Sequence, residues 1–105
     1  MLSFKNTRLD IQQQDALQIA LHNVNANVYL FGSRADLSAQ GGDVDLLLVL
    51  NDEQQDIFKT TLQVSRKYQT ACDEKIDVLV YPALQKLNKE QRSFFDSIRK
   101  ICLTI

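Results

Sequence analysis

The stretch Leu30-Phe31-Gly32-Ser33, followed after nine residues by Asp43-Val44-Asp45-Leu46, decides how this chain is organised. An apolar, strand-like run ends at a glycine, and the next apolar run begins with paired acids. A further acid, Asp77, interrupts the apolar run from Ile76 to Tyr81. An ionised carboxylate is costly to remove from water unless it is paired or binds a metal. Acids in these strand-forming runs therefore indicate a site that needs a cation.

The spacing of the acids predicts where their side chains point. Because side chains alternate along a strand, Asp43 and Asp45 should share one face, roughly 7 Å apart at their backbones. If the strand of Asp77 adjoins theirs, all three carboxylates converge, and their repulsion raises their pKa values unless divalent cations neutralise them. Oxygen ligands suit Mg²⁺, with Mn²⁺ as a substitute. We expect two such ions, which together can clamp a displacement on phosphorus.

Apolar periodicity predicts alternating helices and strands along the chain. Helical spacing extends from Thr7 to about Asn25, from Glu53 to Cys72 with a cap at Asn51 or Asp52, and from Gln85 to Ile101. Strands are predicted at 28–31, 44–50 and 76–81, and Ser33 is expected to cap a helical turn at 34–36. The second helix should bury Ile57, Phe58, Leu62, Tyr68 and Cys72.

The predicted fold class is α/β (α+β), with a small mixed sheet and packed helices in the order α-β-α-β-α-β-α. The central run from Val44 to Leu50 is apolar enough to be covered on both faces. A chain of 105 residues has room for a single core, so one domain is expected over residues 1–105.

Composition restricts the classes of partner. Twelve Lys and Arg residues against thirteen Asp and Glu residues give a net charge of -1, which argues against binding to long nucleic acid. Cys72, Cys102 and His22 are too few to form a four-ligand zinc site. No apolar stretch is long enough for export or for a membrane span, so we expect a cytoplasmic protein.

The C-terminal end carries two unusual apolar features. Phe94 and Phe95 are adjacent, and the chain finishes on the apolar run from Ile101 to Ile105. One interpretation is that Leu103 to Ile105 pairs as an extra edge strand. The other is that these residues form a partner-binding face.

The ordered set Gly32-Ser33, Asp43-x-Asp45 and Asp77 resembles the nucleotidyltransferase superfamily that includes DNA polymerase β and the aminoglycoside nucleotidyltransferases. The resemblance spans Val28 to about Tyr81 and is closest to the minimal, single-domain (MNT) branch. It implies that the three acids bind Mg²⁺ and carry catalysis, and that Gly32 and Ser33 hold nucleotide phosphates.

Two residues have alternative roles at this stage. Arg34 can brace a β- or γ-phosphate, or it can form a salt bridge with Asp36. Asp77 is the candidate general base, with a residue supplied by a partner as the competing choice, and it could instead form an ion pair with Lys75 or Arg66.

The resemblance implies transfer of AMP from ATP to a hydroxyl group. In the minimal branch the partner is typically a small all-helical (HEPN) protein, and some pairs act as toxin and antitoxin, with a toxin tyrosine adenylylated. There are alternatives to this interpretation. The acceptor could be a small hydroxylated molecule such as an aminoglycoside, the chain could bind the toxin without catalysis, and the partner could be a second copy in a homodimer. Asp36-Leu37 departs from the basic residue and glycine usual in this branch, and the loop before Asp43 is one residue shorter. Gly41-Gly42 is expected to let that loop close.

Overall fold

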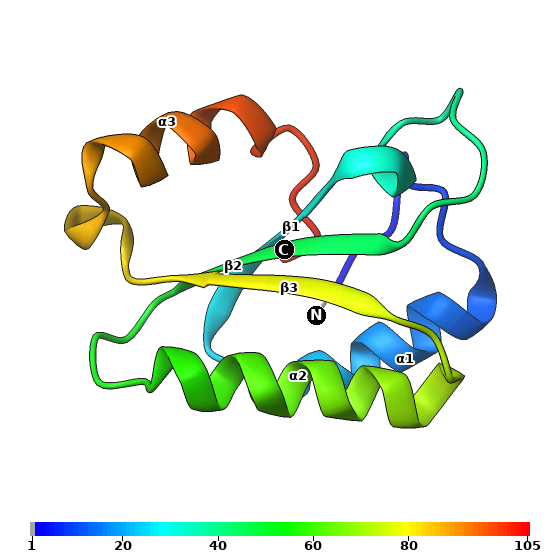
Figure 1. The fold of residues 1–105 in the computed structure, drawn as a ribbon, viewed down its shortest axis with the longest axis horizontal. Helices are drawn as coiled ribbons and strands as arrows, with labels where there is room; N and C mark the ends of the chain where they lie inside the picture. Colours follow the sequence, from blue (N-terminus) through cyan, green and yellow to red (C-terminus); the bar gives the residue numbers. More distant parts are fainter. Residues whose placement is uncertain (1) are drawn as a thin grey trace.

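The computed structural model describes residues 2–105 and places a sheet between two layers of helices (Figure 1). The elements follow in the order α1 (Ile11–Leu21), β1 (Ala26–Phe31), the 3-10 helix η1 (Gly32–Ala35), β2 (Val44–Leu50), α2 (Ile57–Cys72), β3 (Ile76–Tyr81), the 3-10 helix η2 (Leu84–Lys86) and α3 (Lys89–Ile98). The predicted α/β class and the alternation of helices and strands are confirmed.

The sheet is mixed, as predicted, with β2 at its centre. Its strand order is β1-β2-β3, in which β1 and β2 are antiparallel and β2 and β3 are parallel. The bounds of β2 and β3 match the predicted strands, and β1 begins two residues earlier than predicted, at Ala26. Six of the seven residues of β2 are buried, which confirms that this strand is covered on both faces.

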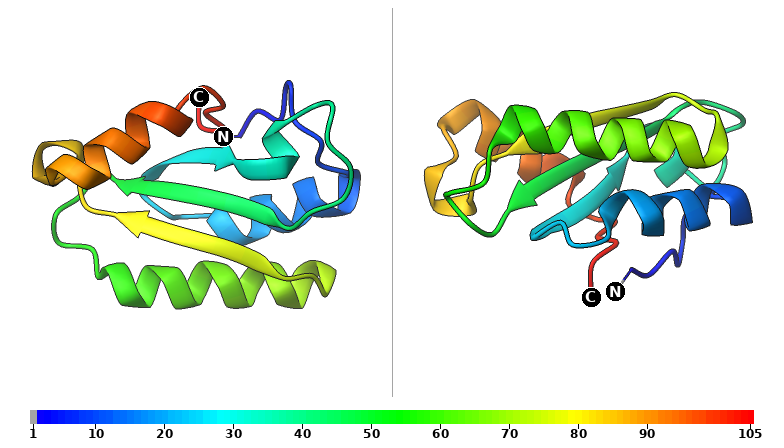
Figure 2. Two further views of the ribbon diagram at one scale, coloured as in Figure 1. Left: turned by 45° about the horizontal axis from the view of Figure 1, so that its top comes forward. Right: turned by 90° about the horizontal axis from the view of Figure 1, so that it is seen from below.

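The two faces of the sheet pack against different helices (Figure 2). On one face, β-strand residues such as Leu30, Leu46 and Leu48 form a core with Leu17 of α1 and Tyr68 of α2. On the other face, Tyr29, Leu47, Val49 and Tyr81 pack against Phe95 of α3. The α3 layer lies over the half of the sheet nearest the end of β3 (Figure 2).

Both adjacent phenylalanines of α3 contact the sheet. The ring of Phe95 meets Tyr29 edge-on at 5.1 Å between centroids, and the ring of Phe94 meets Phe31 in the same way at 5.3 Å. Phe95 is buried, whereas Phe94 is only partly buried. These two residues therefore contribute to the core of this chain.

Helix boundaries differ from the predictions because other polar side chains act as caps. The first helix begins only at Ile11, since Asp10 accepts from the Gln13 amide at 2.8 Å. Asp56 caps α2 through the Lys59 amide at 3.0 Å, whereas Asp52 accepts from the Gln54 amide in the preceding turn. The predicted cap at residue 51 or 52 is therefore wrong.

Two further helix predictions are corrected in the same way. Ser33 does not cap η1, because that short helix begins at Gly32 and Phe31 stands at the cap position without a side-chain bond. The last predicted helix is divided into η2 and α3, and Asn88 caps α3 through the Gln91 amide.

None of the helices within residues 2–105 is long and apolar enough to cross a bilayer.

The predicted burial of α2 is confirmed for Tyr68 and wrong for Ile57 and Phe58. Val64 and Tyr68 are fully buried, whereas Phe58 is 73 % exposed and Ile57 is 40 % exposed. With about 100° of rotation per residue, Phe58 lies roughly 120° around the helix from Val64, so both cannot face the sheet.

The C-terminal segment pairs with the outer edge of β1 through a bridge at Cys102, which confirms the edge-strand interpretation for Leu103 but not for the exposed Ile105. The Leu103 amide donates to the Val28 carbonyl at 2.7 Å, and the Leu30 amide donates to the Ile101 carbonyl at 3.0 Å. Leu103 has no exposed surface. The segment thus protects one of the two edges of the sheet.

Replacement of Leu103 by alanine should test this pairing. We expect the Leu103→Ala variant to lose about 2 to 5 kcal/mol of unfolding free energy, because a buried leucine leaves a cavity. The neighbouring Ile105 is 83 % exposed, so Ile105→Ala should change stability by less than about 0.5 kcal/mol. Urea denaturation measures both. Equal effects of the two substitutions would contradict the pairing.

Candidate active site

The parallel pairing of β2 and β3 brings two of the predicted acids together. Asp45 stands directly opposite Asp77, and Phe31 stands opposite Asp45 on the other side. Residues in such a row share one face of the sheet, with neighbouring strands about 4.8 Å apart. This face is the one that also carries Tyr29 and Leu47, against which α3 packs. Asp45 and Asp77 therefore form an acidic pair across adjacent strands.

The electrostatics of Asp45 show how close the acids are. Partial burial raises the pKa of the Asp45 carboxyl above its usual value, and the next causes are a hydrogen bond that it donates to Asp77 and the charge of Asp77. The charge of Asp43 raises this pKa further. Each of these causes disfavours a second negative charge at Asp45. A divalent cation bound here would favour the opposite state, with both carboxylates ionised.

Asp43 belongs to the same electrostatic group but lies outside the strands that carry the other two acids. It is exposed and lies in the loop that leads into β2. Within residues 2–105, no three side chains of the His, Cys, Asp or Glu type have the spacing of a ready-made metal site. The structure thus brings together Asp45 and Asp77, and it places Asp43 near them on a loop.

The glycine-serine turn directly adjoins the acidic pair. Gly32 has a φ of 74°, and a Cβ atom at this position would overlap the Asp45 carboxylate. Gly42 has a φ of 89°, and a Cβ atom there would overlap the Ser33 hydroxyl. Positive φ angles and such close approach both favour glycine. Gly32 therefore packs on Asp45, and Gly42 packs on Ser33.

Arg34 lies in η1, and its side chain hydrogen-bonds to backbone carbonyls of the loop before β2 and of the N-terminal segment. Its Nε donates to the Gly42 carbonyl and its Nη1 donates to the Arg8 carbonyl, both at 3.0 Å. The alternative salt bridge to Asp36 is absent, because the ion pair found within residues 2–105 joins Lys86 and Glu53. The phosphate-binding role of Arg34 stays a prediction.

Asp77 likewise forms no ion pair with Lys75 or Arg66 in the part of the chain that the structure describes. It is exposed at the start of β3, which is an edge strand. The ion pair that the sequence allowed for Asp77 is therefore not formed within residues 2–105.

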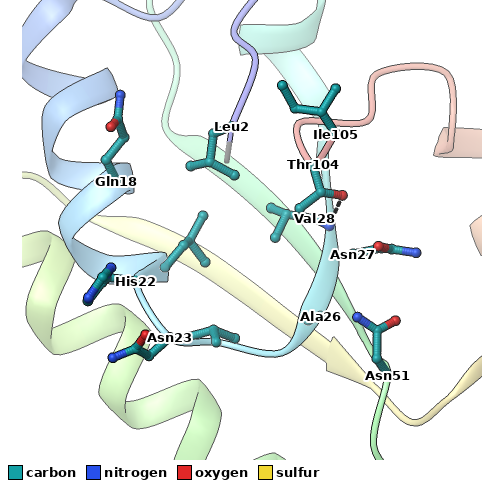
Figure 3. A pocket seen from close by; sticks show the side chains of 12 residues that line it. Leu2, Gln18, His22, Asn23, Ala26, Asn27, Val28, Asn51, Thr104 and Ile105 are labelled. Carbon is teal, nitrogen blue, oxygen red and sulfur yellow. Dashed lines mark hydrogen bonds between the residues drawn. The ribbon is translucent and has the colours of Figure 1, made fainter.

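Two cavities differ in their relation to the acids. One of about 700 Å³ lies at the beginning of β1, where Gln18, Asn23, Asn27 and Asn51 surround an aliphatic floor (Figure 3). No Asp, Glu, Lys or Arg is among the described residues that line it. A second cavity, of about 250 Å³, lies beside Gly32 at the other end of β1 and is also lined by Phe31, Ile98 and Lys100. Only the second cavity adjoins the glycine-serine turn.

The sequence analysis missed two cationic residues near this turn. Lys100 follows α3 and borders the cavity beside Gly32. Arg8 was given no role, yet its guanidinium binds the loop between η1 and β2. Neither residue has a local sequence signal, because both reach the site only through tertiary structure.

Comparison with known proteins gives one solved structure to report. The chain is similar to a protein from Sulfolobus solfataricus whose crystal structure at 1.40 Å is described as that of a "putative nucleotidyltransferase". The match has 22% sequence identity and a TM-score of 0.47, and it covers 88% of this chain and 81% of that chain. A likeness at this level does not establish a shared activity. No protein-family model matches the chain, and no curated protein matches it.

The raised pKa of Asp45 predicts a pH-dependent effect of replacing it. In the unfolded chain the pKa of this carboxyl is 3.8, and in the folded chain it is higher. As the pH rises above 3.8, the unfolded state therefore loses its proton first, and the folded state loses stability until its own carboxyl is ionised. Without metal, we expect Asp45→Asn to be more stable than the wild type at pH 7. The difference should vanish below pH 3.8.

Thermal melts between pH 3 and pH 8 measure this difference. The exposed α3 residue Asp96 supplies the control, and Asp96→Asn should show no such trend. A wild-type protein that gains stability over Asp45→Asn as the pH rises in EDTA would contradict the described electrostatics.

The close approach of Gly32 to Asp45 predicts a specific steric effect. Gly32→Ala should lose more unfolding free energy than Gly41→Ala, by about 1 to 3 kcal/mol, the usual cost of overpacking. Both glycines have positive φ, but a Cβ at Gly41 would meet nothing within 4 Å. Chemical denaturation compares the two variants. Equal losses would show that Gly32 does not pack against the carboxylate.

Proposed function

We propose that this chain is a Mg²⁺-dependent nucleotidyltransferase that transfers AMP from ATP to a hydroxyl group, with a tyrosine of a small helical HEPN-type partner as the acceptor. The observation that supports it best is the cross-strand pair of Asp45 and Asp77 beside Gly32. The pair does not stabilise the fold, because partial burial and the neighbouring Asp77 raise the pKa of the Asp45 carboxyl and so disfavour its ionisation. A cation-dependent reaction gives them a use.

The carboxylates fit a hard cation in their chemistry. Asp45 and Asp77 supply oxygen ligands, and Asp43 can add a third, which is the ligand type that Mg²⁺ favours. When bound, Mg²⁺ neutralises charge on the phosphates and aligns the attacking and leaving oxygens. Asp77, as the more exposed member of the pair, is our candidate for accepting the proton of the attacking hydroxyl.

Gly32 and Ser33 are proposed to hold the phosphates of ATP. The missing side chain of Gly32 leaves the turn in direct contact with Asp45, so phosphates at the turn would lie next to the metal ligands. The cavity beside Gly32 provides about 250 Å³ of adjoining space, and Lys100 on its border supplies positive charge for an anion. These features support nucleotide binding at the turn.

The tyrosine acceptor is proposed from the resemblance to the minimal branch. Two alternatives are a small hydroxylated acceptor such as an aminoglycoside and an antitoxin that binds its partner without catalysis. The departure at Asp36-Leu37 favours neither: Leu37 is 62 % exposed, and Asp36 accepts hydrogen bonds from Ser38.

A labelling experiment tests the function directly. The purified chain is mixed with Mg²⁺, the protein encoded next to it, and ATP labelled on either the α- or the γ-phosphate. We expect label only from the α-phosphate, together with released pyrophosphate and a mass increase of one or more AMP units on a partner tyrosine. Asp45→Asn should lower the rate by about 100-fold or more, as is typical when a group that stabilises transition-state charge is lost.

Controls separate this function from the alternatives. Asp96→Asn should label the partner at the wild-type rate. A parallel reaction also contains the aminoglycoside kanamycin. Label on kanamycin but not on protein would favour the small-molecule acceptor. Neutralisation of the partner in cells by Asp45→Asn, with no labelling by the wild type, would show that the chain acts by binding alone.

A further inference from the structure

Arg8 joins the N-terminal segment to the loop that carries the candidate site. Its Nε donates to the Asp36 carbonyl, and its Nη2 donates to the carbonyls of Ser33 and Gly41, all at 2.8 Å. Its backbone amide also donates to the Arg34 carbonyl at 2.8 Å. One guanidinium thus holds three separate points, one in η1 and two in the loop between η1 and β2.

Arg34, in η1, completes this arrangement. Its bond to the Gly42 carbonyl fixes the peptide group directly before Asp43, and its bond to the Arg8 carbonyl returns to the N-terminal segment. We call these two arginines, together with the carbonyls of Ser33 in η1 and of Asp36, Gly41 and Gly42 in the loop, the arginine clasp. Planar guanidinium groups have several N–H donors in fixed directions and suit such multiple bonding.

The loop would otherwise have little to hold it. Its residues from Asp36 to Asp43 are exposed apart from the partly buried Ala39, and Gly41 and Gly42 add backbone freedom. The closed loop nevertheless determines where the backbone of Asp43 lies. Because the preceding peptide is fixed, the closed loop sets the position from which the Asp43 side chain extends.

We propose that Arg8 is a positioning residue that holds Asp43 within reach of the metal bound by Asp45 and Asp77. This inference rests on the proposed function, since it concerns the metal of the same site. Arg8 acts through the loop carbonyls and touches neither the metal nor the nucleotide. Residues that orient metal ligands typically change metal affinity by 10- to 100-fold when they are replaced.

The sign of the effect distinguishes positioning from simple electrostatics. A nearby positive charge repels a divalent cation, so removing the charge of Arg8 would by itself tighten metal binding. Loss of positioning instead weakens binding. Lysine keeps the charge but is a point donor that cannot span three carbonyls, so Arg8→Lys should also weaken binding.

The test measures the dissociation constant of Mn²⁺ by electron paramagnetic resonance, with no nucleotide or partner present. We expect Arg8→Ala and Arg8→Lys each to weaken binding by about 10-fold. The exposed Arg66 on α2 is the matched control, and Arg66→Ala should leave the affinity unchanged. Thermal melts confirm that every variant is folded at the temperature of the measurement.

A double-mutant cycle shows whether Arg8 acts through Asp43. In the Asp43→Asn background, Arg8→Lys should have no further effect on Mn²⁺ affinity, because the ligand that it positions is already lost. Additive losses, unchanged affinity or tighter binding in the Arg8 variants would overturn the inference. The two proposals can fail separately. If the Arg8 variants contradict positioning but the wild type binds Mn²⁺ and Asp45→Asn does not, the proposed metal site stands without the role of Arg8. If the wild type binds no Mn²⁺, both proposals fail.

Discussion

Parallel pairing of β2 with β3 sets Asp45 against Asp77, and this contact between two acids is the constraint on which the candidate site depends. It works against folding, because partial burial and the neighbouring carboxyl both disfavour ionisation of Asp45. The register cannot relax by one residue without moving the apolar side chains of β3 to the wrong face. The buried residues of the sheet therefore hold the two acids together.

The remainder of the fold places other groups around this pair. The layer of α1 and α2 covers the opposite face of the sheet, while α3 packs against Tyr29 and Tyr81 on the face that carries the acids. Gly32 lets the end of β1 approach Asp45, and the arginine clasp ties the following loop back to the N-terminal segment. An acidic pair in which ionisation of Asp45 is disfavoured, next to a glycine turn, is the kind of local conflict that is expected at functional sites.

Much of this could be predicted from sequence because the signals are local. The apolar runs of β2 and β3 have bounds that the strand pattern alone identifies, and the matching positions of the acids in those runs predict their shared face. Helix ends were harder to predict, since Asp52 and Asp56 are both competent caps and only the structure shows that Asp56 is used. The role of Arg8 could not be predicted, because its partners are backbone carbonyls that lie 25 to 33 residues away in sequence.

The central claim is that the Asp45–Asp77 pair binds a divalent metal beside the glycine-serine turn. A crystal structure of the chain grown with Mn²⁺ and a non-hydrolysable ATP analogue tests it most directly, through the anomalous signal of manganese. The account predicts a peak within about 2.5 Å of carboxylate oxygens from both residues, with the phosphates of the analogue at Gly32 and Ser33. Bound analogue with no manganese at the pair, or manganese bound elsewhere, would contradict it.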